Sequence, residues 1–184
     1  MTAPAAESPL HDVFMGHAEA TANRLVELHA RLLSGELTVD GFVALAAGLV
    51  GRANAQAFAL ADLSLAAWVT AATQSAAPTL GLVLPDEGPR LRDGLSTLLA
   101  AVDPEAPELR VARYGRAEAA RAFQRGYSEG IAERDDEIGG WRRRLNTTAC
   151  QLCVWLWREG KIYPASRRMT QHPGCGCHPE PVLR

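Results

Sequence analysis

The residues best suited to chemistry are four cysteines and a histidine near the C-terminal end of the chain. Cys150 and Cys153 form a C-x-x-C pair, and 21 residues separate Cys153 from Cys175, which is followed by Cys177. His172 lies three residues before Cys175. A C-x-x-C turn directs two thiolates to one side, and residues i and i+2 of an extended segment also share a side. Zinc takes four tetrahedral nitrogen and sulfur ligands, so this spacing predicts a structural zinc ion (Zn2+).

The spacing leaves open which four residues bind the metal, because His172 can replace one cysteine and His178 is a spare donor. Two disulfides, or redox-active thiols, are the alternatives. The N-terminal segment MTAPAAESPL has no basic residue and no apolar run, so we expect no secretion signal and a reducing compartment, which favours a metal. A catalytic zinc needs an open position and a carboxylate base. The only acids near in sequence are Glu159 and Glu180, so we predict a closed site and no enzyme.

Charge is distributed unevenly along the chain. Residues 141–184 have a net charge of +6, whereas residues 1–140 have a net charge of −8. A basic segment favours polyanions such as genomic DNA, bound non-specifically, or an acidic protein surface. The alternatives are a solvated surface, or arginines that compensate an anionic metal site. The candidate contact residues for nucleic acid or a partner are Arg142, Arg143, Arg144, Arg167 and Arg168.

The scaffold that positions these residues is predicted to be helical. Apolar residues recur at spacings of three and four over residues 8–34, which predicts a helix there. A second, long and Ala-rich helix runs to about Ala72, and Thr38 or Asp40 is its predicted N-cap.

Proline and glycine divide the rest of the helical region. Residues 74–88 are a predicted connection, in which the apolar run 80–84 forms a short strand or packs on the helices. Pro89 starts a third helix. Asp103 and Pro104 open a fourth, which is predicted to end near Ile138 at two glycines.

The predicted fold class is therefore mainly α, with two regions. Residues 1–138 form a long-helix bundle or arm, and residues 139–184 form a small Cys/His module stapled by zinc. Gly126 and Gly130 mark close helix packing or merely weaken the fourth helix. No window holds the ~20 strongly apolar residues of a membrane span. The small core of the module is predicted to be aromatic and to consist of Trp141, Trp155, Trp157 and Tyr163. The alternative is that exposed tryptophans of this set anchor a partner protein.

Two stretches of the module carry a family resemblance. They are residues 140–164, GWRRRLNTTACQLCVWLWREGKIYP, and residues 169–182, MTQHPGCGCHPEPV. They resemble the C-terminal region of phage Mu F-like minor head proteins, of the type found in tailed phages of actinobacteria. The matching features are Gly140-Trp141, Cys150 and Cys153, the tryptophan-rich run with Arg158-Glu159-Gly160, Pro164, His172, Cys175-x-Cys177 and Pro181.

The resemblance implies a virion component and not an enzyme. Family members are minor capsid proteins inside the head, at or near the portal, with roles in head morphogenesis and in packaging or ejecting DNA. The implied partners are the portal protein and other head proteins, with no membrane and no small-molecule substrate. The implied location is the capsid interior, with the host cytoplasm during assembly. The alternative function is a zinc-dependent DNA-binding or regulatory module, but no base-reading spacing of Arg, Asn or Gln on a helix supports it.

Overall fold

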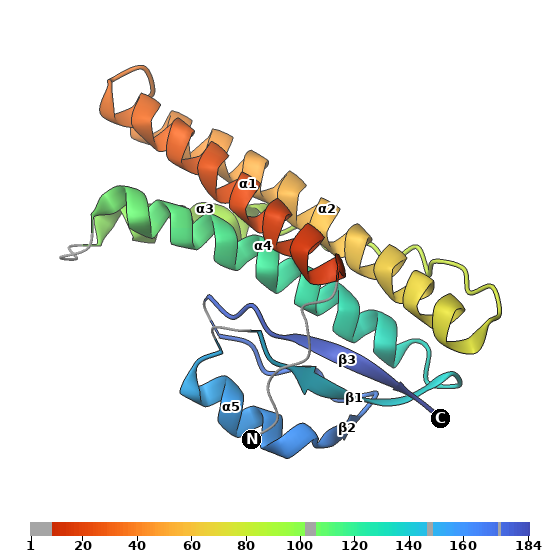
Figure 1. The fold of residues 1–184 in the computed structure, drawn as a ribbon. Helices are drawn as coiled ribbons and strands as arrows, with labels where there is room; N and C mark the ends of the chain where they lie inside the picture. Colours follow the sequence, from red (N-terminus) through yellow and green to blue (C-terminus); the bar gives the residue numbers. More distant parts are fainter. Residues whose placement is uncertain (1–8, 102–105, 147–148, 173) are drawn as a thin grey trace.

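The protein is mainly helical, with long helices and a small C-terminal three-stranded sheet that carries the Cys/His cluster (Figure 1). The computed structural model describes residues 9–101, 106–146, 149–172 and 174–184. The elements are α1 (Pro9–Leu33), α2 (Val39–Thr73), α3 (Gly88–Ala100), α4 (Pro107–Ala132), β1 (Ile138–Arg144), α5 (Gln151–Trp157), η1 (Arg158–Gly160), β2 (Ile162–Pro164) and β3 (His178–Leu183).

The first two helices confirm the sequence prediction closely. The stripe residues Phe14, Ala18 and Leu25 of α1 are buried against the other helices. Thr38 is the N-cap of α2, because its Oγ1 accepts a hydrogen bond of 3.1 Å from the Gly41 amide. This bond satisfies one of the amide groups that a helix start leaves unpaired.

The helices form a bundle, and α4 lies between the other helices and the sheet (Figure 1). One apolar cluster lies where α1, α2, α3 and α4 meet, around Phe42 and Leu91. A second cluster begins at Phe14 and Phe123 in the bundle and continues to Trp141 in β1. The helical body and the C-terminal sheet therefore share one core, and each buries apolar surface of the other.

Helix α2 departs from the expectation that no stretch of the chain is apolar enough for a membrane span. Its most apolar 18 residues have a mean hydropathy of 1.3, enough in length and composition to cross a membrane. In this structure α2 packs on α1, α3 and α4. It also buries Asn54 and Asp62, which hydrogen-bond to groups outside the helix.

The end of the fourth helix corrects the prediction. Helix α4 ends at Ala132 and not near Ile138, and residues 133–137 form turns that lead into β1. Ile138 continues the helical spacing of the apolar residues, yet it is the first, fully buried residue of the strand. Gly140 serves the strand pairing, since a Cβ there would clash with the Tyr163 carbonyl oxygen of β2. Asp103 and Pro104, the predicted start, lie outside the described residues.

The apolar run 80–84 forms no strand, and it packs only loosely on the bundle: Leu82 and Leu84 are partly buried, whereas Leu80 and Val83 are exposed. The carboxylate of Asp62 in α2 holds it by accepting hydrogen bonds from the amides of Leu80, Gly81 and Leu82, at 3.0, 2.8 and 3.4 Å. A buried carboxylate that accepts several amide hydrogens substitutes for the sheet partners that these amides lack.

Gly126 marks a close helix contact, and this gives a first testable prediction. A Cβ there would lie 2.9 Å from the Phe58 carbonyl oxygen of α2, so Gly126→Ala forces α2 and α4 apart. We expect a loss of about 1–3 kcal/mol in the free energy of unfolding, measured by urea denaturation. Gly16→Ala in α1 is the matched control, because nothing lies within 4 Å of its added Cβ. That variant is expected to gain roughly 0.5–1 kcal/mol from helix propensity, and equal effects of the two variants would contradict the contact.

Candidate metal centre

The C-terminal module brings together all five predicted ligands. Cys150 is the N-cap of the short helix α5, and Cys153 follows one turn later. His172, Cys175 and Cys177 come from the segment between β2 and β3. The sheet has the order β2-β1-β3, and its antiparallel pairing brings this segment beside α5. Cys153, Cys175 and Cys177 are buried, whereas Cys150 is exposed.

The five ligand atoms form two overlapping groups that share Cys153. In the first, the His172 Nε2 atom lies 3.3 Å from the sulfur of Cys150 and 3.0 Å from that of Cys153. In the second, the sulfurs of Cys153 and Cys175 are 3.4 Å apart and Cys177 completes the group. All four cysteines are free thiols, not disulfides. A group of two cysteines and a histidine beside a group of three cysteines could hold a metal ion such as zinc.

His178, the spare donor, belongs to neither group. It is the first residue of β3 and lines a separate groove between the sheet and α2. Pro173 lies outside the described residues.

Helix α4 supports the second half of the cluster through a residue that sequence reasoning missed. Gln124 is buried, and its Nε2 donates hydrogen bonds to the carbonyl oxygens of Cys175 at 2.8 Å and Cys177 at 2.6 Å. Gly174 takes a φ of +75°, a conformation that favours glycine. A Cβ on Gly176 would lie 2.7 Å from the side-chain amide nitrogen of Asn146, which would have to move. The peptide that bears the cysteines is thus fixed to the helical body.

Arg143 is the charge partner of the cluster. Its side chain is only 2% exposed, and its Nη1 lies 3.7 Å from the Cys153 sulfur and 3.9 Å from the Cys175 sulfur. Its Nη2 donates to the Thr170 carbonyl oxygen at 2.5 Å. Among the described residues no carboxylate forms an ion pair with it. Because a buried cation without a counter-charge is costly, the sulfurs are the groups within this described part of the chain that can balance Arg143.

The thiols of the cluster differ in pKa, and therefore in how easily each ionises to supply a negative charge. A hydrogen bond from Cys177 lowers the pKa of the Cys175 thiol to about 5. Burial raises the pKa of Cys153 to about 12. Of these two buried thiols, that of Cys175 is therefore the more readily ionised, and its sulfur lies 3.9 Å from the Arg143 Nη1 atom.

The other predicted contact residues lie on the surface with partners inside the protein. Arg142 and Arg144 both pair with Glu180, at 2.6 and 3.5 Å. Arg168 pairs with Glu129 at 3.3 Å, and the Arg167 guanidinium stacks 4.8 Å from the centre of the Tyr163 ring. Arg143, by contrast, faces the cysteines and offers nothing to an external polyanion in this structure.

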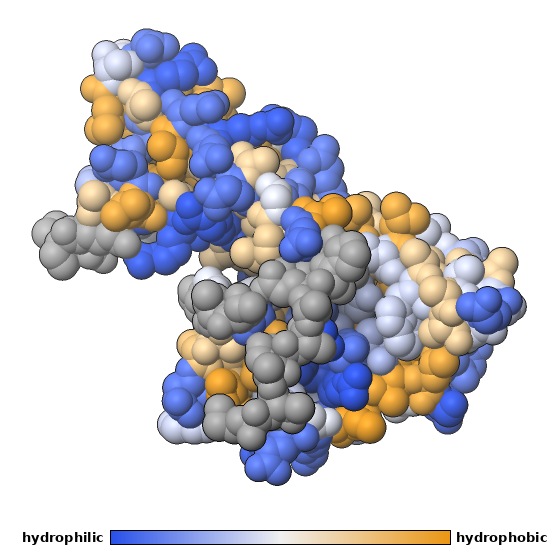
Figure 2. All heavy atoms as spheres, viewed as in Figure 1, coloured by the Kyte–Doolittle hydropathy of each residue, from blue (hydrophilic) through white to orange (hydrophobic). Residues whose placement is uncertain are grey.

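Two of the four residues predicted to form the aromatic core of the module are buried there. Trp141 stacks on Tyr163 with ring centres 4.7 Å apart, and both rings are buried. Trp155 is 66% exposed, so its assignment to the core was wrong. On the short helix α5 Cys153 points to the cluster, which leaves Trp155 on the outer side. Trp157 is half-buried, and Figure 2 shows hydrophobic side chains among hydrophilic ones over the module.

One carboxylate near the centre was also missed. Glu118 of α4 lines a hollow of about 280 Å³ together with His172 and Cys175. Its oxygens are engaged by Arg90 at 2.5 Å and Arg121 at 3.3 Å. Glu118 could not be predicted as a neighbour of the metal centre, because it is far in sequence from the C-x-x-C pair. Only the packing of α4 on the module brings the two together.

Comparisons with protein-family models, with curated proteins and with solved structures found no match for this chain.

Proposed function

We propose that the protein is a minor capsid protein of a tailed phage, inside the head at or near the portal. There it supports head assembly and the packaging or ejection of DNA. We further propose that the C-terminal module contains one structural zinc ion. The phage assignment is supported by the motif of residues 140–182, which resembles Mu F-like minor head proteins.

The observation that carries the zinc proposal is the buried Arg143 against two cysteine sulfurs. A thiolate–zinc centre is anionic, −2 with four cysteines and −1 with three cysteines and a histidine, so one guanidinium balances it wholly or in part. Arg143 needs a negative charge on a neighbouring sulfur, and zinc needs ionised sulfurs too, since a bound thiol must lose its proton. Neutral thiols or disulfides would leave Arg143 without a counter-charge.

A structural role is favoured over a catalytic one by the number of ligands. Five nitrogen and sulfur donors lie in two groups of three that share Cys153, so enough donors are present to fill four positions without water or substrate. Glu118, the nearest described candidate for a base, is held by two arginines and would have to leave both to accept a proton.

Zinc would make the module rigid and hold it in a fixed position on the helical body. The ion would join α5 to the segment before β3, and Gln124 ties that segment to α4. An assembly protein needs a defined relation between two surfaces, here the acidic helices and the basic module. We propose the portal protein and other head proteins as the partners of these surfaces.

Virion composition tests this assignment. The chain is expected in purified mature particles by quantitative mass spectrometry, at a constant ratio to the portal protein across preparations. A regulatory DNA-binding protein would be abundant in infected cells and absent from particles. Loss of the chain from particles after nuclease treatment and high salt, with the portal retained, would also contradict the proposal.

A further inference from the structure

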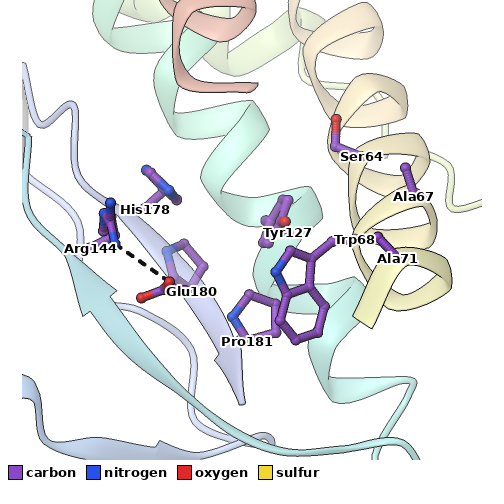
Figure 3. A pocket seen from close by; sticks show the side chains of 10 residues that line it. Ser64, Ala67, Trp68, Ala71, Tyr127, Arg144, His178, Glu180 and Pro181 are labelled. Carbon is purple, nitrogen blue, oxygen red and sulfur yellow. Dashed lines mark ion pairs between the residues drawn. The ribbon is translucent and has the colours of Figure 1, made fainter. Parts of the chain in front are cut away.

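Cys150 is the only one of the four cysteines that is exposed to solvent. The other three, Cys153, Cys175 and Cys177, are buried, and none of them is more than 4% exposed. The groove between the sheet and α2, which is lined by Trp68 (Figure 3), includes none of the four sulfurs. A small solute that diffuses to the cluster from water therefore meets the sulfur of Cys150 first.

The nearest thiol on the same element is that of Cys153. Cys150 is the N-cap of α5 and Cys153 follows one turn later, and their sulfurs lie within 4.8 Å of each other. Residues three apart on a helix share a face, so an S–S bond of about 2.0 Å requires an adjustment of α5 alone. Cys175 and Cys177 belong to the other ligand group, which does not include Cys150. The C-x-x-C pair is thus one exposed thiol beside one buried thiol that can close a disulfide with it.

A disulfide within this pair would dismantle the metal centre as a whole. Cys153 is common to both ligand groups, so its oxidation together with Cys150 leaves His172, Cys175 and Cys177 as donors. Three donors are one fewer than structural zinc takes. Helix α5 would lose its metal link to the segment before β3, whereas Gln124 would still hold that segment on α4.

We propose that Cys150 and Cys153 form an oxidation site for peroxides, and that closure of their disulfide releases the metal from the C-terminal module. This inference rests on the zinc centre of the proposed function. Exposed thiolates that lie next to a second cysteine are the thiols that peroxides oxidise reversibly. The two features that single out this pair are the exposure of Cys150 and the position of Cys153 in both ligand groups.

The reaction has two steps. A metal-bound thiol has already lost its proton, so the Cys150 thiolate can attack one oxygen of hydrogen peroxide. The O–O bond breaks, the sulfur becomes a sulfenic acid, and hydroxide leaves. The Cys153 thiolate then attacks this sulfur, the S–S bond forms, and a second hydroxide leaves. The two sulfurs together lose two electrons, and one hydrogen peroxide is reduced to two hydroxide ions.

Hydrogen peroxide added to the zinc-loaded, full-length chain tests this site. We expect the bound zinc to pass to a chromophoric chelator and two of the four free thiols to be lost. Peptide mapping by mass spectrometry, after alkylation of the remaining thiols, is expected to find a link between Cys150 and Cys153. Dithiothreitol followed by zinc should restore the starting zinc content, because a disulfide is reducible whereas a sulfinic acid is not.

Cys150→Ser and Cys177→Ser are the matched variants, because each removes one thiol and leaves four of the five donors. Each rate of zinc release is measured relative to the same variant without peroxide. Cys150→Ser should slow the peroxide-driven release at least about tenfold, because the thiols that remain are buried. Cys177→Ser keeps the exposed pair and should release zinc at the rate of the unaltered chain.

Three results would overturn the proposal: equal peroxide sensitivity of the two serine variants, zinc retained after peroxide treatment, or a first disulfide between Cys153 and Cys175. The last pair is the closest alternative, since its sulfurs are 3.4 Å apart. Metal analysis before peroxide is added tests the zinc centre separately. A chain without zinc would contradict that centre and the release of a metal, whereas the mapped link reports on the oxidation site whether or not a metal is bound.

Discussion

Cys153→Ser is expected to lower zinc affinity at least about 1,000-fold and to unfold α5 and the segment before β3. Cys153 is the one residue common to both ligand groups, so its loss separates the Cys150–His172 half from the Cys175–Cys177 half. Binding of structural zinc contributes about 10–16 kcal/mol in small zinc domains. The sheet shares its core with the helices, but the buried cysteines form a separate small cluster against Leu145 and Ala149, which cannot replace that contribution. Competition with a chromophoric chelator measures the affinity, and metal analysis gives the zinc bound per chain.

Cys150→Ser is the matched comparison for this experiment. Cys150 is exposed and belongs to one ligand group only, so a fifth donor can take its place. A loss at least tenfold smaller than that of Cys153→Ser is expected. Near-ultraviolet circular dichroism reports the stacked Trp141 and Tyr163, whose signal should fall when a chelator removes the metal. Two results would contradict a structural zinc site: full zinc content in the Cys153→Ser variant, or an unaltered chain that is purified with disulfides and no metal.

The parts of the fold that sequence reasoning reached are those set by neighbouring residues. The Thr38 cap and the buried stripe of α1 follow from spacings of a few residues, which a helix converts directly into a face. The ligands Cys150 and Cys153 could also be predicted from the sequence, because a C-x-x-C pair has few chemical roles. The clustering of all five donors then required only that two short segments meet.

The parts that were missed depend on pairing between distant residues. Ile138 fits a helical repeat and a buried strand equally well, and only its pairing with β3 decides between them. In the run Arg142 to Arg144, three identical side chains have different surroundings, because alternation along β1 buries Arg143 beside Trp141 and exposes Arg142. Strand alternation over Trp141 and Arg143 was the available signal, but the helical interpretation up to Ile138 concealed it.

Arg143→Met tests whether this buried arginine belongs to the metal centre. The substitution keeps most of the apolar volume and removes the positive charge near the sulfurs of Cys153 and Cys175. Without that charge the thiolates are harder to form and the anionic zinc centre is harder to bury. Loss of a group that supports metal ligands typically lowers affinity about 10- to 100-fold, and we expect a loss in this range by chelator competition.

Arg142→Met separates this effect from a general loss of positive charge. Arg142 is the neighbouring residue, half exposed, and its partner is Glu180 on the surface. Exposed ion pairs contribute little, so zinc affinity and Tm are expected to stay close to those of the unaltered chain.

Arg143→Lys should retain part of the affinity, because an ammonium supplies the charge but not the planar fork that reaches the sulfurs and the Thr170 carbonyl together. Equal zinc affinity in the Arg143→Met and Arg142→Met variants would show that the guanidinium has no part in balancing the thiolates. A buried interaction is also poorly screened, so the affinity lost in Arg143→Met should persist in high salt.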